Sequence, residues 1–110
     1  MNHNIDFIKQ WIESQSRVLD VGCGPGTGLN AWKDLGIYAK GIEPDESRAR
    51  HGINQGLDIE TVTWMDFNEN LEKGTLLTSI QSLEHFYNPK NFLKHMRSLC
   101  KEEVMIYVEV

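Results

Sequence analysis

The stretch RVLDVGCGPGTG, residues 17–28, places an apolar run directly before a cluster of glycines. Three of them, Gly22, Gly24 and Gly26, alternate with other residues. Glycine adopts positive φ angles, and because it has no side chain it lets another group approach the backbone closely. In open α/β sheets, ligands bind at the carboxyl ends of the strands, often beside such a turn. The stretch therefore predicts a strand, a turn that binds a ligand, and a following helix.

The rest of the chain alternates the periodicities of strands and helices. The expected strands cover residues 16–21, 39–43, 59–64, 75–80 and 103–110. The expected helices cover residues 4–14, 27–35 and 45–51 and a segment that begins at Asn88 and Pro89. Strands separated by helices predict an α/β fold, a mostly parallel sheet of about five strands with helices on both faces.

Single residues refine these helix predictions. Asn88 before a proline is a favourable helix start, and Gly52 stands where a helix C-terminus favours a left-handed residue. The apolar spacing places Leu35 and Leu93 on faces that point inward.

Composition limits both the organisation and the partners of the chain. With 110 residues, of which 40% are hydrophobic, we expect residues 1–110 to form a single domain. The formal net charge is −5 and the 11 basic residues are scattered, which argues against nucleic-acid and anionic-membrane partners and favours a small molecule. No stretch approaches the ~20 apolar residues of a membrane span and no signal peptide is recognisable, so a soluble, cytoplasmic protein is expected. The 2 cysteines are expected as reduced thiols, and no metal site is predicted.

The glycine turn fits two familiar nucleotide sites poorly. The dinucleotide pattern G-x-G-x-x-G requires a third glycine where Thr27 stands, and the Gly-Lys-Ser/Thr ending of a phosphate loop is missing. Asp20 precedes the turn, and its carboxylate would repel a pyrophosphate but attract an ammonium or sulfonium group. The turn therefore favours a cationic or zwitterionic ligand.

Acidic residues stand at the ends of three successive expected strands or just after them: Asp20, Glu43 and Asp66. Glu43 could accept hydrogen bonds from both hydroxyls of a ribose, and Asp66 could accept one from an adenine amine. Each acid also has a structural explanation by itself, as a turn cap, a helix-start acid or a solvated charge. Together with the glycine turn, the three predict an adenosyl ligand.

At this point the sequence resembles the class I S-adenosylmethionine-dependent methyltransferases. The matching segments are VLDVGCGPGTG, GIEP, WMDF and SLEHFYNPKNFLKHM, and the last is similar to the branch with ubiquinone and small-molecule O-methyltransferases. The resemblance implies a Rossmann-like methyltransferase fold, S-adenosylmethionine as methyl donor and S-adenosylhomocysteine as product. The residues that it assigns to the donor site are Asp20, Gly22, Cys23, Gly24, Gly26, Glu43, Pro44, Asp66, Phe67, Gln81, Ser82 and Leu83.

The resemblance also implies individual roles. Glu43 would bind the ribose, Pro44 would lie against the adenine, and Asp66 and Phe67 would meet its amine and its ring. His85, at the rim of the site with Glu84, is the candidate catalytic base for an oxygen acceptor; the alternative is a structural histidine.

The family's sheet has seven strands, and the last two are absent from this chain, so we expect a C-terminally incomplete domain whose exposed fifth strand could pair two copies into a homodimer. Three function classes stay open. The first is methyl transfer to a small-molecule acceptor. The second is a non-catalytic S-adenosylmethionine-binding domain or fragment of a larger protein, and the third is a nicotinamide-dinucleotide domain.

Overall fold

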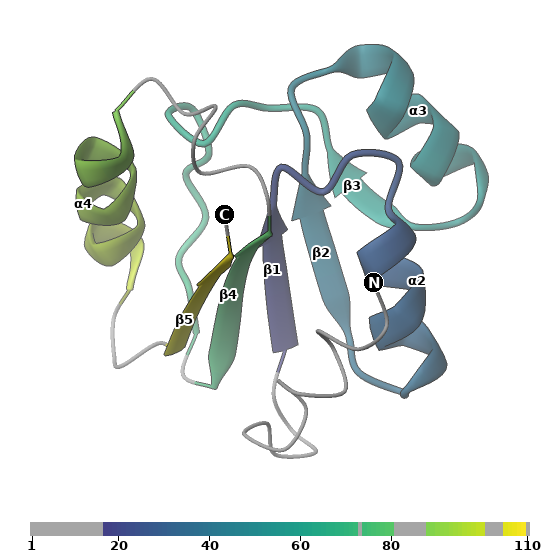
Figure 1. Ribbon diagram of the computed structural model, residues 1–110, viewed down its shortest axis with the longest axis horizontal. Helices are drawn as coiled ribbons and strands as arrows, with labels where there is room; N and C mark the ends of the chain where they lie inside the picture. The colour runs from purple at the N-terminus through teal and green to yellow at the C-terminus, as the bar shows by residue number, and fades with distance from the viewer. Residues whose placement is uncertain (1–16, 73, 81–87, 101–104, 110) are drawn as a thin grey trace.

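A computed structural model describes residues 17–72, 74–80, 88–100 and 105–109 of the chain (Figure 1). The strands in these residues are β1 (Arg17–Val21), β2 (Ala39–Ile42), β3 (Asp58–Glu60), β4 (Thr75–Ile80) and β5 (Met105–Glu109). The helices are α2 (Thr27–Asp34), α3 (Glu46–Asn54) and α4 (Pro89–Leu99). The helix expected at residues 4–14 lies outside the described residues.

The five strands form one sheet in the order β3-β2-β1-β4-β5, and every neighbouring pair is parallel. All strands therefore point the same way, and their carboxyl ends lie along one edge of the sheet (Figure 1). The chain runs outward from β1 to β2 and β3 and then returns to the other side of β1 as β4. This reversal places a switch point between β1 and β4, where open α/β sheets hold their ligands.

Alternate residues of β1 face opposite sides of the sheet, as the period of a strand requires. Leu19 and Val21 belong to the core that includes Phe92 of α4. Val18 belongs to a second cluster with Trp32 of α2. Helices α2 and α3 lie on the opposite side of the sheet from α4 (Figure 1). The predicted parallel sheet with helices on both faces is confirmed.

The third strand is shorter than the predicted residues 59–64, because the chain leaves the sheet after Glu60. The backbone carbonyl of Thr63 accepts hydrogen bonds from the amides of Asp66 and Phe67, at 3.2 and 3.0 Å, which closes a turn. Trp64 then packs edge-on against the ring of Phe92, with 5.5 Å between the ring centroids. The aromatic residue that the pattern assigned to a strand is instead buried under α4.

Three predictions about helix residues are wrong, whereas the predicted cap at Asn88 is confirmed by its side chain accepting from the amide of Asn91 at 3.1 Å. Gly52 does not end α3 but lies buried inside it. Leu35 follows the last residue of α2 and is 43% exposed. Leu93 is 40% exposed because its neighbour Phe92 occupies the face of α4 that meets the core.

Candidate functional site

The glycine turn joins the end of β1 to the start of α2 at the carboxyl edge of the sheet (Figure 1). The amides of Gly22 and Cys23 both donate to the carbonyl of Ile42, at 2.9 and 3.2 Å. The turn is therefore fastened to the end of β2 and does not project freely. Gly24 and Gly26 have φ angles of 59° and 92°, a region that residues with a side chain rarely adopt.

Two glycines of the turn lack a side chain for different reasons. A Cβ on Gly26 would lie 2.4 Å from Cδ1 of Leu57, so this glycine lets the turn pack against the protein itself. A Cβ on Gly24 would meet nothing within 4 Å. Among the described residues beyond its chain neighbours, no atom occupies the Cβ position of Gly24, although the residue itself is buried.

Helix α3 also packs closely on the turn. A Cβ on Gly52 would lie 2.7 Å from the carbonyl oxygen of Pro25. Glycine at this position of α3 therefore allows the helix to touch the turn, which explains why Gly52 lies inside the helix and not at its end.

The side chain of Cys23 turns toward β2. A Cβ on Gly41 would lie 2.4 Å from the Cys23 sulfur, and Cys23 packs against the cluster that contains Leu29. Burial raises the pKa of this thiol to about 12, and the charges of Asp20 and Glu43 act in the same direction. The thiol is therefore protonated and unreactive at neutral pH, and Cys23 would contribute to a ligand site through its backbone.

Glu43 follows the last residue of β2. Its two carboxylate oxygens accept hydrogen bonds from the glycine turn and from the residue that caps α3. Its Oε1 accepts from the amide of Gly24 at 2.8 Å, and its Oε2 accepts from the amide of Asp45 at 2.9 Å. The side chain is 6% exposed. Each oxygen retains a second lone pair, so the carboxylate that braces the turn could also accept hydrogen bonds from a ligand hydroxyl.

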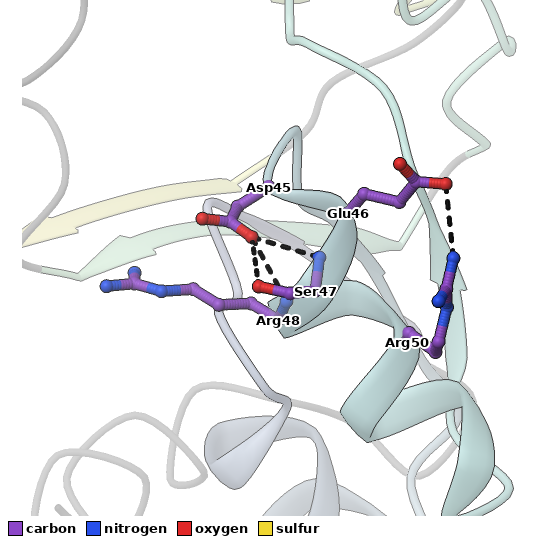
Figure 2. A network of polar contacts seen from close by, with 5 residues as sticks. All are labelled: Asp45, Glu46, Ser47, Arg48 and Arg50. Carbon is purple, nitrogen blue, oxygen red and sulfur yellow. Dashed lines mark hydrogen bonds and ion pairs between the residues drawn. The ribbon is translucent and has the colours of Figure 1, made fainter.

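Asp45, two residues after Glu43, caps the start of α3 within a polar network (Figure 2). Oδ1 of Asp45 accepts from the amides of Ser47 and Arg48, at 3.0 and 3.2 Å. The hydroxyl of Ser47, which donates to the same oxygen at 2.8 Å, and the Arg48 amide hold the pKa of Asp45 below its usual value. Glu46 and Arg50 form an ion pair one turn apart on the exposed side. The network therefore caps the first turn of α3 and pairs two of its exposed charges.

Asp20 is a buried carboxylate on β1, 9% exposed, near the start of the turn. Its Oδ1 accepts from the hydroxyl of Thr78 at 2.9 Å. Burial raises the pKa of Asp20 to about 6; the hydrogen bond from Thr78 opposes this shift, and the charge of Glu43 adds to it. Within the described residues, neither Asp20 nor Glu43 forms an ion pair with a basic side chain. The two acids leave the turn with a negative potential that a cationic ligand would neutralise.

The acid after the third strand lies apart from this pair. Asp66 is exposed in the turn after β3, and Pro44 is exposed beside Glu43. Phe67 is only 1% exposed and belongs to the core that α4 covers. The prediction that its ring meets a ligand disagrees with this burial, because the turn that starts at Thr63 directs Phe67 into the core. The backbone of Phe67 is also engaged, since its amide donates to the carbonyl of Thr63 and its carbonyl oxygen lies 2.8 Å from Nε2 of His95.

The predicted donor-site residues Gln81, Ser82 and Leu83, with Glu84 and the candidate base His85, lie outside the described residues. Their roles stay predictions. No cluster of three or more metal-ligating side chains occurs in the part of the chain that the structure describes.

Thr78 is a site residue that sequence reasoning missed. It lies directly opposite Asp20 on the neighbouring strand β4 and is 0% exposed. The available signal was a hydroxyl in the middle of TLLTSI, directly after two leucines. Its partner, 58 residues away in the sequence, could be recognised only once the register of β1 against β4 was known.

A comparison with known protein families shows the family of this chain. The sequence model of the family described as methyltransferase domain matches residues 1–110. The chain belongs to this methyltransferase family, and the resemblance to class I S-adenosylmethionine-dependent methyltransferases is confirmed.

Two curated relatives give the scale of the match. The ubiquinone biosynthesis O-methyltransferase of Haemophilus ducreyi is 32% identical over 103 residues, which cover 84% of this chain and 44% of that protein. The enzyme of the same name from Actinobacillus pleuropneumoniae is 30% identical over 116 residues, 94% of this chain and 50% of that protein. The chain thus spans about half the length of the curated relatives it matches.

Solved structures share the fold at lower identity. A plantazolicin methyltransferase in complex with S-adenosylhomocysteine superposes with a TM-score of 0.74 and 22% identity, covering 84% of this chain and 38% of that one. A mycolic acid cyclopropane synthase, also complexed with S-adenosylhomocysteine, gives a TM-score of 0.76 and 21% identity, covering 96% of this chain and 41% of that one. These structures support the Rossmann-like methyltransferase fold.

Proposed function

We propose that the glycine turn of this chain binds S-adenosylmethionine and that the protein transfers the methyl group to a hydroxyl of a small molecule. Two curated relatives are named O-methyltransferases, which favours oxygen as the acceptor atom. The observation that carries the proposal is the pair of buried acids, Asp20 and Glu43, beside the glycine turn.

The described residues fit the chemistry of this cofactor. At Gly24 no described residue beyond its chain neighbours occupies the Cβ position, so the backbone there could meet the methionine part. Glu43 offers a carboxylate already held in place by two amides, so little conformational freedom would be lost when it accepts the ribose hydroxyls. Asp20 offers a negative charge without a basic partner among the described side chains. Asp66, exposed after β3, would accept from the adenine amine, beside Pro44.

When bound, the cofactor would supply an electrophilic methyl group on a sulfonium: the acceptor oxygen would bond to the methyl carbon as the carbon–sulfur bond breaks, and S-adenosylhomocysteine would be the leaving group. The residues of this chain would therefore bind and orient the donor and exclude water from the crevice, and these effects lower the barrier without a covalent protein intermediate. The hydroxyl proton of the acceptor must leave during transfer. His85 stays the predicted base for that proton.

Binding is the first test of this proposal. Isothermal titration calorimetry with S-adenosylmethionine and S-adenosylhomocysteine should detect binding, and NAD should give none. Glu43→Ala should weaken both adenosyl ligands at least about tenfold, because it removes two charge-assisted hydrogen bonds to ribose. Glu46→Ala, which removes an exposed acid of α3, is the matched control. A folded protein that binds NAD and neither adenosyl ligand would refute the proposal.

Transfer is tested separately from binding. Incubation with methyl-labelled donor and a panel of phenols and alcohols should yield labelled products and S-adenosylhomocysteine. Binding of the donor without transfer to any acceptor would support the non-catalytic alternative.

Location and assembly are further proposals. No helix in the described ranges is long and apolar enough to cross a membrane. We place the protein in the cytoplasm as a proposal, which cell fractionation would test. Strand β5 is an edge of the described sheet, and edge strands can pair with a second copy. Sedimentation equilibrium would show a dimer if two copies pair there and a monomer if they do not.

A further inference from the structure

Asp20 and Thr78 occupy matching positions on two strands that are distant in the sequence. In the register of β1 against β4, Asp20 lies directly opposite Thr78. Side chains at matching positions of parallel neighbours point to the same face of the sheet, and the Thr78 hydroxyl donates to Oδ1 of Asp20 at 2.9 Å. Thr78 is completely buried and Asp20 nearly so. The two strands meet at the switch point of the sheet, where the proposed cofactor site lies.

The carboxylate of Asp20 has few other stabilising partners. The hydrogen bond from Thr78 is the one recorded for its side chain within the described residues. Its second oxygen, Oδ2, faces the first turn of α2, where a Cβ on Gly28 would lie 3.5 Å away. A buried carboxylate is ordinarily compensated by several donors or by a cation. Asp20 therefore has unused capacity for a positive charge on the side of the glycine turn.

The charged and titratable groups around Asp20 make ionisation costly. Glu43 faces it from the end of β2 and Cys23 from the turn. The first turn of α2 carries no acidic side chain, and β4 contributes the Thr78 hydroxyl. Burial and Glu43 together raise the pKa of Asp20 to about 6 against the opposing effect of Thr78. Among these neighbours, Thr78 is thus the side chain that favours the ionised form.

We propose that Thr78 is a positioning residue that keeps Asp20 ionised and oriented toward the glycine turn, so that in acidic solution cofactor binding is linked to the release of a proton from Asp20. This inference rests on the proposed function, because it needs a cationic ligand at the turn. Both adenosyl ligands qualify, since each carries an ammonium group on its amino-acid part. The attraction is present when Asp20 is charged and lost when Asp20 is protonated.

The linkage predicts a specific pH profile. Affinity should be nearly constant above neutral pH, fall below a midpoint near pH 6, and be about tenfold weaker at pH 5 than at pH 8. Replacing the hydroxyl of Thr78 by a methyl group removes a hydrogen bond to a charged acceptor, which should move the midpoint upward by about one to two pH units. At pH 7 the variant should therefore bind several-fold more weakly, and it should recover its affinity at higher pH.

The experiment measures binding of S-adenosylhomocysteine and S-adenosylmethionine by calorimetry from pH 5 to pH 9. The key variant is Thr78→Val, which keeps the shape of the side chain, and Thr78→Ser should restore the midpoint of the unmodified protein. Thr75→Val is a matched control, because Thr75 lies on the same strand, is 3% exposed, and has a buried hydroxyl without a hydrogen-bond partner. It makes the same chemical change without removing a contact to Asp20, so its midpoint should not move. The ionisable groups of the ligand titrate in the same way in every experiment, so they do not affect the comparison between variants.

The outcomes separate this inference from the proposed function. The inference is supported if the midpoint shifts upward in Thr78→Val but not in Thr75→Val, and if Thr78→Ser has the midpoint of the unmodified protein. An equal loss of affinity at every pH would mean a purely structural role and overturn it, as would an unchanged midpoint. If Thr78→Val does not fold, Asp20→Asn serves instead: it should remove the dependence between pH 5 and pH 8, and a retained dependence would overturn the inference. Absence of binding at every pH by the folded, unmodified protein would refute the proposed function as well.

Discussion

Glu43 accepts a hydrogen bond from the backbone amide of Gly24 at 2.8 Å, across 19 positions of the sequence. The same carboxylate accepts from Asp45 at the start of α3. A single side chain thus connects the glycine turn, the end of β2 and the following helix. The acid that the sequence assigned to a ligand is also part of the turn's own support, so its substitution should affect stability as well as binding.

Glu43→Gln should lower the free energy of unfolding by about 1–3 kcal/mol, because the amide nitrogen of glutamine would face a backbone N–H where a carboxylate oxygen now accepts. Urea unfolding at pH 7 measures the loss. Glu46→Gln changes an exposed acid that pairs with Arg50, and its effect should stay below about 0.5 kcal/mol. Equal effects of the two substitutions would contradict a bracing role for Glu43.

Asp20→Asn should stabilise the ligand-free protein at pH 7 by up to about 3 kcal/mol. The pKa of Asp20 is about 6 in the folded state against a usual value of 3.8, so its ionisation costs free energy on folding. In the unmodified protein the contribution of Asp20 to stability is fully present below about pH 4 and is lost as the pH rises through 6. The stability of Asp20→Asn should not show this decrease as the pH rises.

Urea unfolding between pH 4 and pH 7 measures that pH dependence. Asp34→Asn, at the exposed end of α2, should leave the dependence between pH 4 and pH 6 intact. A loss of stability at pH 7 in Asp20→Asn would argue against the burial cost described for Asp20.

Gly41→Ala should destabilise the protein by about 1–3 kcal/mol through overpacking. The added Cβ would lie 2.4 Å from the Cys23 sulfur and 2.8 Å from Cδ1 of Leu29. Gly28→Ala is the control, since its Cβ would make one ordinary contact, 3.5 Å from Oδ2 of Asp20, and alanine favours a helix. Thermal unfolding should place Gly28→Ala at or above the unmodified protein, and a similar loss in both variants would refute this packing argument.

Cys23 should react with iodoacetamide at pH 8 more than about a hundredfold more slowly than in the urea-unfolded chain. Its raised pKa of about 12 leaves very little thiolate at that pH. Peptide mass spectrometry measures the rate, with Cys100 on the same chain as an internal reference. Rapid labelling of Cys23 in the folded protein would show that the turn does not bury it.

The sequence by itself determined the order of strands and helices along the chain and the position of the proposed site after the first strand. The apolar run before Gly22 and the acid at Glu43 are local patterns, and a strand, a turn and a helix follow from neighbouring residues alone. The parallel sheet was predictable for the same reason, because strands joined by helices leave few topologies.

Tertiary structure decided which of these residues face a ligand and which face the protein. Gly26 and Gly52 remove side chains for packing against Leu57 and Pro25, and Phe67 is withdrawn into the core. Thr78 meets Asp20 only because β4 returns to the far side of β1 in a particular register. Such contacts depend on how distant segments align. Residue spacing within one segment indicates which side chains share a face, but not which residue of a distant strand lies opposite.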